Sequence, residues 1–247
     1  MKELLKGLLR KTLGQIQKVE SLFDEDYIAK DIHHSNIVSH DRWEEYLYTT
    51  FNKPGLRILE VGSREVTGNS DARNRFDKAE YVGFDYYNGN NVDVVGDAHK
   101  LSQYFKDGEQ FDLIFSSACF EHFAMPWQVS KEMAKMCKVG GHIFVETHFS
   151  FSSHERPWHF YHFSDMALRT LFSEAIGIQC IEAGVSTPIV GRFSKYAASY
   201  LRLKPVKAMY CHVEFLGKKM EHVENFDWNT VQIETLVGDS KYPEPKD

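Results

Sequence analysis

The chain has 247 residues, of which 43% are hydrophobic and 26% are charged, a balance typical of a globular protein. Its 29 basic and 35 acidic residues give a net charge of −6, so we expect no general attraction to nucleic acid. The four cysteines form no C-x-x-C pair, which argues against a disulfide framework or a zinc knuckle and fits a cytoplasmic location.

The first segment, residues 1–53, is predicted to be helical. Between residues 2 and 23, apolar side chains fall on one helical stripe, formed by Leu5, Leu9, Leu13 and Ile16. Charged residues interrupt this stretch every few positions, so we expect neither a signal peptide nor an integral membrane segment. The amphipathic helix is expected to dock on the domain or on a second copy, which makes a homo-oligomer possible. Its excess of lysine and arginine also permits contact with an anionic membrane surface.

Strands and helices alternate from residue 54 to residue 220, as in a βαβ array. Strands are predicted at 57–61, 81–84, 92–95, 111–115, 143–147, 178–185 and 209–217. Helices are predicted at 42–51, from 99, at 127–137 and at 165–172, with Gly140 and Gly141 ending the third of them. Residues 186–207 form an insertion with an ambiguous, helix-like pattern, and residues 221–247 form an acidic, solvated tail.

The stretch from Arg57 to Ser63 reads as a buried parallel strand that ends in Glu60 and a glycine turn at Gly62. Ligands of open α/β sheets bind beyond such strand ends. A dinucleotide requires G-x-G-x-x-G, and this turn lacks those glycines because Ser63 and Arg64 follow Gly62. A carboxylate beside the turn instead suits a ligand with an ammonium or sulfonium group, and S-adenosylmethionine carries both.

This stretch resembles the opening motif of the class I S-adenosylmethionine-dependent methyltransferases, and in particular of the methyltransferase type 11 group. Gly68 fits the second glycine of that motif, whereas Arg64 departs from the commoner Glu-x-Gly-x-Gly pattern. The resemblance covers about residues 56–150. It implies a Rossmann-like α/β fold, with a mostly parallel seven-stranded sheet and helices on both faces.

The resemblance also implies how the cofactor S-adenosylmethionine is held. Asp85 ends the second strand and would accept hydrogen bonds from both ribose hydroxyls. Asp97 would take the adenine amino group, and the backbone N–H of Ala98 would meet a ring nitrogen. The residues expected to bind the cofactor are Glu60, Gly62, Ser63, Asp85, Tyr86, Asp97, Ala98 and Ser117. Each aspartate taken singly is also a common turn former or helix cap.

Histidines are the candidates for the reacting end. A hydroxyl acceptor must lose a proton as it attacks, so we expect a general base, His154 first and His122 second. The loop 148–163 is the candidate substrate lid, with His148, Trp158, His159 and Tyr161 as substrate contacts. The alternative for these aromatic residues is packing on the domain. A metal site of His148, His154, His159 and His162 is a further alternative, but the spacings lack the i, i+4 arrangement of known motifs, so no metal is predicted.

We therefore expect an S-adenosylmethionine-dependent methyltransferase that methylates oxygen on a small polar acceptor or a glycan. The saccharide acceptor is suggested by the composition of the lid and by the association of similar methyltransferases with surface saccharide synthesis. Two alternatives stay open: a noncatalytic binding protein that keeps the fold, and a nicotinamide-dependent oxidoreductase.

Overall fold

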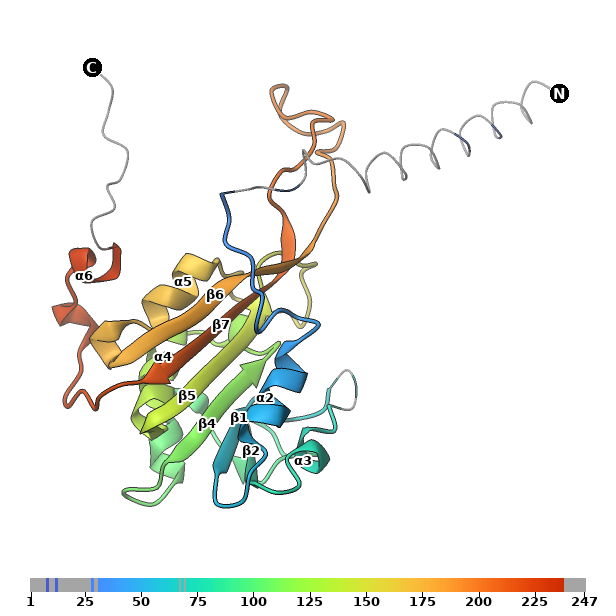
Figure 1. Ribbon diagram of the computed structural model, residues 1–247. Coiled ribbons are helices and arrows are strands. Elements are labelled where there is room, and N and C mark those ends of the chain that lie inside the picture. Colours follow the sequence, from blue (N-terminus) through green and yellow to red (C-terminus); the bar gives the residue numbers. More distant parts are fainter. Residues whose placement is uncertain are drawn as a thin grey trace.

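The computed structural model of this chain describes residues 31–66, 68 and 70–237, together with residues 8, 12 and 28. Seven strands form one sheet in the order β3-β2-β1-β4-β5-β7-β6 (Figure 1). They are β1 (Arg57–Val61), β2 (Glu80–Asp85), β3 (Val94–Val95), β4 (Phe111–Ser117), β5 (Cys137–His148), β6 (Ile178–Pro188) and β7 (Tyr210–Lys219). Strand β7 runs antiparallel to both β5 and β6, and the other pairs are parallel. The predicted mostly parallel, seven-stranded sheet is confirmed.

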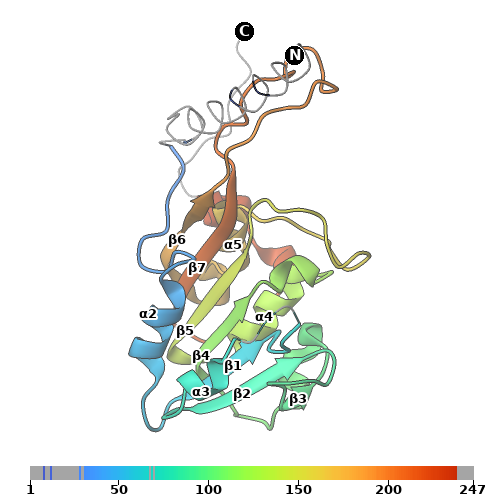
Figure 2. The ribbon, with the colours of Figure 1, turned by 90° about the vertical axis from the view of Figure 1, so that its right-hand side faces the viewer.

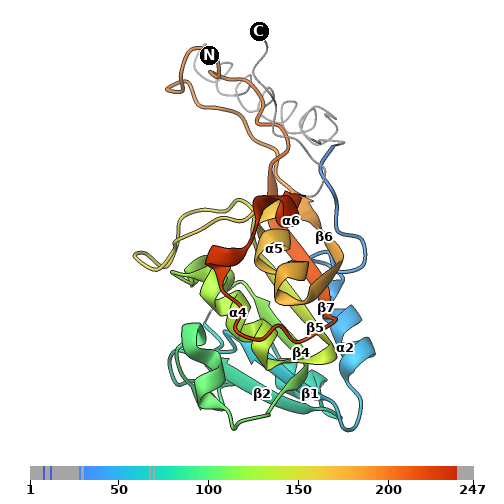
Figure 3. The same ribbon diagram turned by 90° about the vertical axis from the view of Figure 1, so that its left-hand side faces the viewer.

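Helices cover both faces of this sheet. The α-helices are α2 (Trp43–Phe51), α3 (Ala72–Arg75), α4 (Pro126–Met136), α5 (Asp165–Leu171) and α6 (Ile233–Val237). Short 3-10 helices are η2 (Ala98–Tyr104), η3 (Phe120–His122), η4 (Glu174–Ile176) and η5 (Trp228–Thr230). Helix α2 lies on one side of the sheet and helices α4 and α5 lie on the other (Figures 2 and 3). The helix predicted at 2–23 lies outside the described residues, apart from residues 8 and 12.

Two cores result from the alternation of side chains along the strands. Ile58 of β1 packs in the core that contains α2, whereas the next residue, Leu59, packs in the core that contains α4. In the first core, the ring of Trp43 stacks on Phe144 of β5, with centroids 5.1 Å apart. Because both faces are covered, the strands need apolar residues at consecutive positions, which explains the continuous hydrophobic runs in the sequence.

The chain before α2 covers the outer edge of the sheet. The backbone of Ser35 donates to the Val185 carbonyl of the edge strand β6, at 3.1 Å. The Glu182 carboxylate, also on β6, accepts the backbone N–H groups of residues 36–38 at 2.8–3.0 Å. These bonds pair an edge that would otherwise be open to another chain. Part of the predicted N-terminal segment is therefore tied to the sheet.

Helix α4 ends at Met136, within one residue of its predicted end, but the structure corrects the predicted role of the glycines and the predicted start of the fifth strand at residue 143. The glycines at 140 and 141 do not end the helix, because Cys137 already has extended backbone angles, φ −82° and ψ 130°. Strand β5 starts at Cys137 and includes Gly140, whose φ is +88°. The helix therefore passes directly into the strand, and the glycines accommodate an irregular start of the strand.

The connection between β6 and β7 also differs from its prediction. Residues 189–209 contain turns and a single bridge between Arg192 and Pro205, and no helix forms in this stretch. The connection projects beyond the end of the sheet (Figure 1).

After β7, the indole Nε1 of Trp228 donates to the carbonyl of Trp127 at 2.8 Å, so the chain keeps contact with the domain beyond residue 220.

Candidate functional site

The turn after β1 can be made only by a residue without a side chain. Gly62 has φ +88°, a conformation that side chains disfavour. A Cβ atom at this position would lie 2.4 Å from Sγ of Cys119, which is closer than real contacts allow. The backbone N–H of Gly62 donates to the carbonyl of Phe84 at 2.8 Å, which fixes the turn against β2. The turn therefore presents bare backbone at the carboxyl edge of the sheet.

Glu60 supports this turn from inside the protein. Its side chain is buried, and its carboxylate accepts hydrogen bonds from the Tyr81 hydroxyl and, at 3.4 Å, from Nδ2 of Asn91. The same Asn91 amide donates to the carbonyl of Ser63 at 3.1 Å. Burial raises the pKa of Glu60 to about 7. Glu60 therefore acts on the turn through Asn91, and Oγ of Ser63 is a buried atom with no partner among the described residues.

Asp85, at the end of β2, is held by the residue that departs from the familiar glycine pattern. Its Oδ2 accepts the backbone N–H of Arg64 at 3.2 Å, and its Oδ1 accepts Nε of Arg64 at 3.3 Å. Oδ1 also accepts the backbone N–H of Tyr87 at 3.0 Å. The neighbouring Tyr86 is 58% exposed. Asp85 thus lies beside the glycine turn as predicted, with Arg64 as a partner that the sequence did not reveal.

Asp97 follows β3 and caps η2. Its Oδ1 accepts two bonds from His99, from the backbone N–H at 3.0 Å and from Nδ1 at 2.6 Å. Nε2 of His99 accepts the N–H of Met125 at 3.2 Å, so the proton of this imidazole is on Nδ1. Although burial opposes it, the His99 side chain and backbone lower the pKa of Asp97. Ala98 is buried next to it.

Ser117, the last residue of β4, forms a hydrogen bond with the neighbouring strand β5. Its hydroxyl donates to Oε1 of Glu146 at 3.1 Å, and Oε2 of the same carboxylate lies 2.9 Å from Nδ1 of His40. The hydrogen bond that the His40 ring donates to Glu146 raises the pKa of His40, against the effect of burial. The serine therefore belongs to a network that joins β4 and β5 to the segment before α2.

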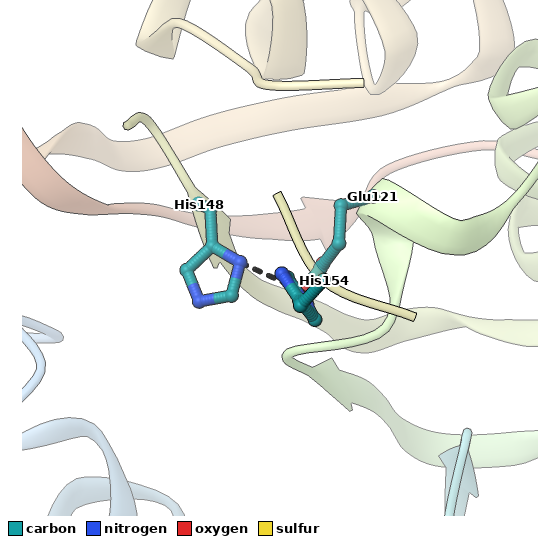
Figure 4. Close-up of side chains that lie close together, drawn as sticks. All are labelled: Glu121, His148 and His154. Carbon is teal, nitrogen blue, oxygen red and sulfur yellow. Dashed lines mark ion pairs between the residues drawn. The ribbon is translucent and has the colours of Figure 1, made fainter. Parts of the chain in front are cut away.

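Glu121 of η3 is the centre of a group of histidines. Its side chain is fully buried, and its Oε2 accepts the Thr147 hydroxyl at 2.6 Å. Its Oε1 lies 2.9 Å from Nδ1 of His148 and 3.9 Å from Nε2 of His154 (Figure 4). Nε2 of His122 is also 3.9 Å from this oxygen. Burial alone would raise the pKa of Glu121, but His148 and Thr147 outweigh it and hold the value at about 2.

The predicted lid is tied to the same residue. The backbone N–H groups of Phe160 and Tyr161 donate to the carbonyl of Glu121, at 2.8 and 3.2 Å. The hydroxyl of Tyr161 donates to the Ala124 carbonyl at 3.1 Å, and its ring packs against the core, so this side chain packs on the domain instead of standing free. Trp158 is 55% exposed, and the His159 ring lies 4.5 Å from that of His154.

The structure thus brings together two groups of predicted residues. Gly62, Ser63, Asp85 and Tyr86 lie around the turn, while His122, His148 and His154 surround Glu121. His159 lies beside His154. Sequence reasoning missed Arg64 and His99 as partners of the two aspartates, and Glu121 as the centre of the histidines. The position of Glu121 was a usable signal, because it follows a strand end and stands next to His122. A carboxylate that is buried at such a place needs hydrogen-bond donors around it, and histidines can supply them.

Known proteins resemble this chain in sequence over one segment and in overall fold. A family model described as a methyltransferase domain matches residues 59–145. The YcgJ protein of Bacillus subtilis has a similar structure, with a TM-score of 0.50, 16% identity, and coverage of 74% of this chain and 100% of that chain. The plantazolicin methyltransferase BamL, solved with a triazolic desmethylPZN analog and SAH, has a TM-score of 0.50 and 17% identity, covering 72% of this chain and 84% of that chain. No curated protein matches the chain in sequence.

The two structural neighbours establish likeness of fold. Among the residues that the structure describes, none forms a helix both long and apolar enough to span a membrane.

Proposed function

We propose that the chain, whose residues 59–145 match the methyltransferase domain model, methylates a small polar acceptor or a glycan at a hydroxyl oxygen, with S-adenosylmethionine as the methyl donor. The observation that carries this proposal is the set of groups at three neighbouring strand ends: the Gly62 turn after β1, Asp85 after β2 and Asp97 after β3. When bound, S-adenosylmethionine supplies a methyl group on a positively charged sulfur.

The residues at these strand ends fit such a cofactor. Gly62 lets the chain turn tightly after β1, with Cys119 packed against it, so the turn lies at the carboxyl edge of the sheet, where ligands of such folds bind. An ionised carboxylate accepts about four hydrogen bonds, and Asp85 has three in the structure. Its bond with Nε of Arg64 is the longest at 3.3 Å, so a ribose hydroxyl would displace that contact first. Both bonds from His99 end on Oδ1 of Asp97, which leaves Oδ2 for the adenine amino group.

The histidines around Glu121 supply the base. Nδ1 of His154 lies 2.9 Å from the Ser152 carbonyl, and Nδ1 of His122 lies 3.0 Å from the Trp158 carbonyl. A carbonyl only accepts, so each Nδ1 carries the proton and each Nε2 presents a lone pair. Either Nε2 can therefore take the proton of an attacking hydroxyl. We assign His154 as the base and His122 as the second candidate.

The exposed part of the lid provides contacts for the acceptor. The Trp158 ring is 55% exposed, and a large aromatic surface of this kind stacks well on a sugar. His159 lies beside His154 and offers a hydrogen-bonding partner at the same place. His148 is buried, so its role is to orient Glu121 and the lid.

A noncatalytic binding protein is the second candidate, and one observation favours it: Arg64 engages Asp85, the acid that a ribose would need. Isothermal titration with S-adenosylmethionine, S-adenosylhomocysteine and NAD separates the possibilities. We expect both sulfur ligands to bind and NAD not to bind. Binding of NAD alone would indicate an oxidoreductase, and binding of none of the three would contradict the proposed function.

A further inference from the structure

Three side chains from separate parts of the chain direct ligand atoms at one point. Glu121 comes from η3, His148 ends β5, and His154 belongs to the loop after β5 (Figure 4). Oε1 of Glu121, a ring nitrogen of His148 and a ring nitrogen of His154 all lie within 4.8 Å of one another. These atoms are one carboxylate oxygen and two imidazole nitrogens, which are donors that divalent transition metals prefer.

The two innermost atoms of this group lie in close contact with each other, but they are not aligned as in a regular hydrogen bond. Oε1 of Glu121 and Nδ1 of His148 are buried, and neither makes a correctly aligned hydrogen bond within the described residues, although they lie 2.9 Å apart. Buried polar atoms are almost always paired, because an unpaired one costs free energy. No atom fits into the 2.9 Å between these two atoms, so a cation that both of them bind would lie beside the pair, on the side of His154.

The neighbours of this group orient its atoms as the outer shell of a metal site does. The Thr147 hydroxyl holds Oε2 of Glu121 at 2.6 Å, which leaves Oε1 to face the histidines. The Ser152 carbonyl holds Nδ1 of His154 at 2.9 Å, which leaves the lone pair of Nε2 toward Glu121. A carboxylate and imidazole rings fixed through their outer atoms are typical of metal-binding sites.

We propose that Glu121, His148 and His154 bind one divalent transition-metal cation of the Zn²⁺ type. Ligand atoms about 2.0–2.1 Å from a tetrahedral Zn²⁺ lie roughly 3.3 Å from one another. The two distances from Oε1, 2.9 Å to His148 and 3.9 Å to His154, bracket that value. Small rotations of the two rings therefore complete the site, and the fourth position stays open.

His122 lies beside two of the proposed ligands. Its Nε2 is 3.9 Å from Oε1 of Glu121, and its ring centroid is 5.0 Å from that of His154. If the Nε2 lone pair of His154 binds the cation, His154 can no longer act as the base, and His122, the second candidate base, would accept the proton of an acceptor hydroxyl held at the cation. This last step rests on the proposed methyl transfer, whereas binding of the cation does not.

The test is a titration of chelator-treated, full-length protein with Zn²⁺, followed by calorimetry and by competition with a coloured chelator. We expect one equivalent to bind tightly and Mg²⁺, which prefers oxygen ligands, not to compete. Replacing an outer-shell partner typically weakens a metal site 10–100-fold, so His148→Ala and His154→Ala, which remove ligands, should each weaken binding at least 100-fold. Glu121→Gln, which preserves the size of a buried side chain, should do the same.

The matched control is His162→Ala, a histidine of the same loop that is exposed and is not one of the three proposed ligands. It should bind Zn²⁺ like the parent. Circular dichroism checks that each variant is folded. His154→Ala should disturb the fold least, because 27% of the His154 side chain is exposed. Equal binding by the parent, His148→Ala and His154→Ala would overturn the proposal, as would the lack of a saturable single site. Titration of the same metal-free samples with S-adenosylmethionine reports separately on the proposed function.

Discussion

The guanidinium of Arg64 lies 3.3 Å from the carboxylate of Asp85, at the end of β2 where a ribose would bind. Arg64 is also within 5.5 Å of the centre of the Tyr87 ring. The residue that departs from the glycine pattern of the first turn is therefore in contact with the acid proposed to select the cofactor. Binding of the ribose hydroxyls to Asp85 therefore requires the Arg64 side chain to give up its hydrogen bond with this carboxylate.

Removing this carboxylate tests the cofactor site. Asp85→Ala should weaken the binding of S-adenosylmethionine by about 1.5–3 kcal/mol, the value of a hydrogen bond to a charged group. Calorimetry gives the dissociation constant, and thermal unfolding shows that the variant is folded. Arg64→Ala keeps the carboxylate and should bind at least as well as the parent. Unchanged affinity in Asp85→Ala would remove this acid from the site.

Substitution of Gly62 tests whether the turn tolerates a side chain. Gly62→Ala should destabilise the fold by about 1–3 kcal/mol more than Gly140→Ala, because overpacking adds to the backbone strain. Both glycines have φ +88°, but a Cβ at Gly140 meets nothing within 4 Å, whereas a Cβ at Gly62 meets Cys119. Denaturant unfolding measures the difference. Adding Cys119→Gly to Gly62→Ala should restore part of the loss, and equal stability of the two alanine variants would contradict the clash.

Two single variants test the histidines as bases. His154→Ala and His122→Ala should each lower kcat by about 10²–10⁴-fold, with little change in the affinity for S-adenosylmethionine. The measurement is a methyl-transfer assay on a panel of hydroxyl acceptors, and His162→Ala serves as the control from the same loop. If both variants turn over at nearly the parent's rate, positioning of the acceptor alone drives the reaction.

The buried Glu214 on β7 predicts a pH dependence of stability. Burial raises its pKa to about 7 from an ordinary value of 4.5. The folded state therefore favours the protonated form of Glu214, and this preference stabilises the fold. The stabilisation is complete below pH 4.5, the pKa of the group in the unfolded chain, and it is lost as the pH rises through about 7, its pKa in the folded protein. The free-energy difference between these limits is about 3 kcal/mol.

Glu214→Gln has no proton to lose at this position. The parent should therefore lose stability relative to Glu214→Gln between about pH 5 and about pH 8. Thermal unfolding at a series of pH values measures the trend. The control is Glu45→Gln, which replaces a carboxylate that is 74% exposed and should show no such trend. A difference between parent and Glu214→Gln that does not vary with pH would show that the carboxyl group is not protonated in the fold.

Local patterns in the sequence determined the sheet. Runs of apolar, β-branched residues marked all seven strands, because a strand covered on both faces must be apolar at consecutive positions. The same patterns located Gly62, Asp85 and Asp97 at strand ends. The predicted start of the fifth strand at residue 143 was wrong, because the glycines at 140 and 141 look like a break before the strand, while pairing with β4 already holds Cys137 extended.

Only the tertiary structure decided which polar groups meet. Glu121 and His148 are 27 residues apart in the sequence, and they become neighbours because parallel pairing of β4 with β5 aligns Ser117 with Glu146 and so brings the residues after each strand together. Arg64 reaches Asp85 in the same way, since β1 and β2 are adjacent parallel strands. Sequence periodicity reports which face of an element is buried, but it carries no information on partners across the sheet, because those contacts depend on the order and register of the strands.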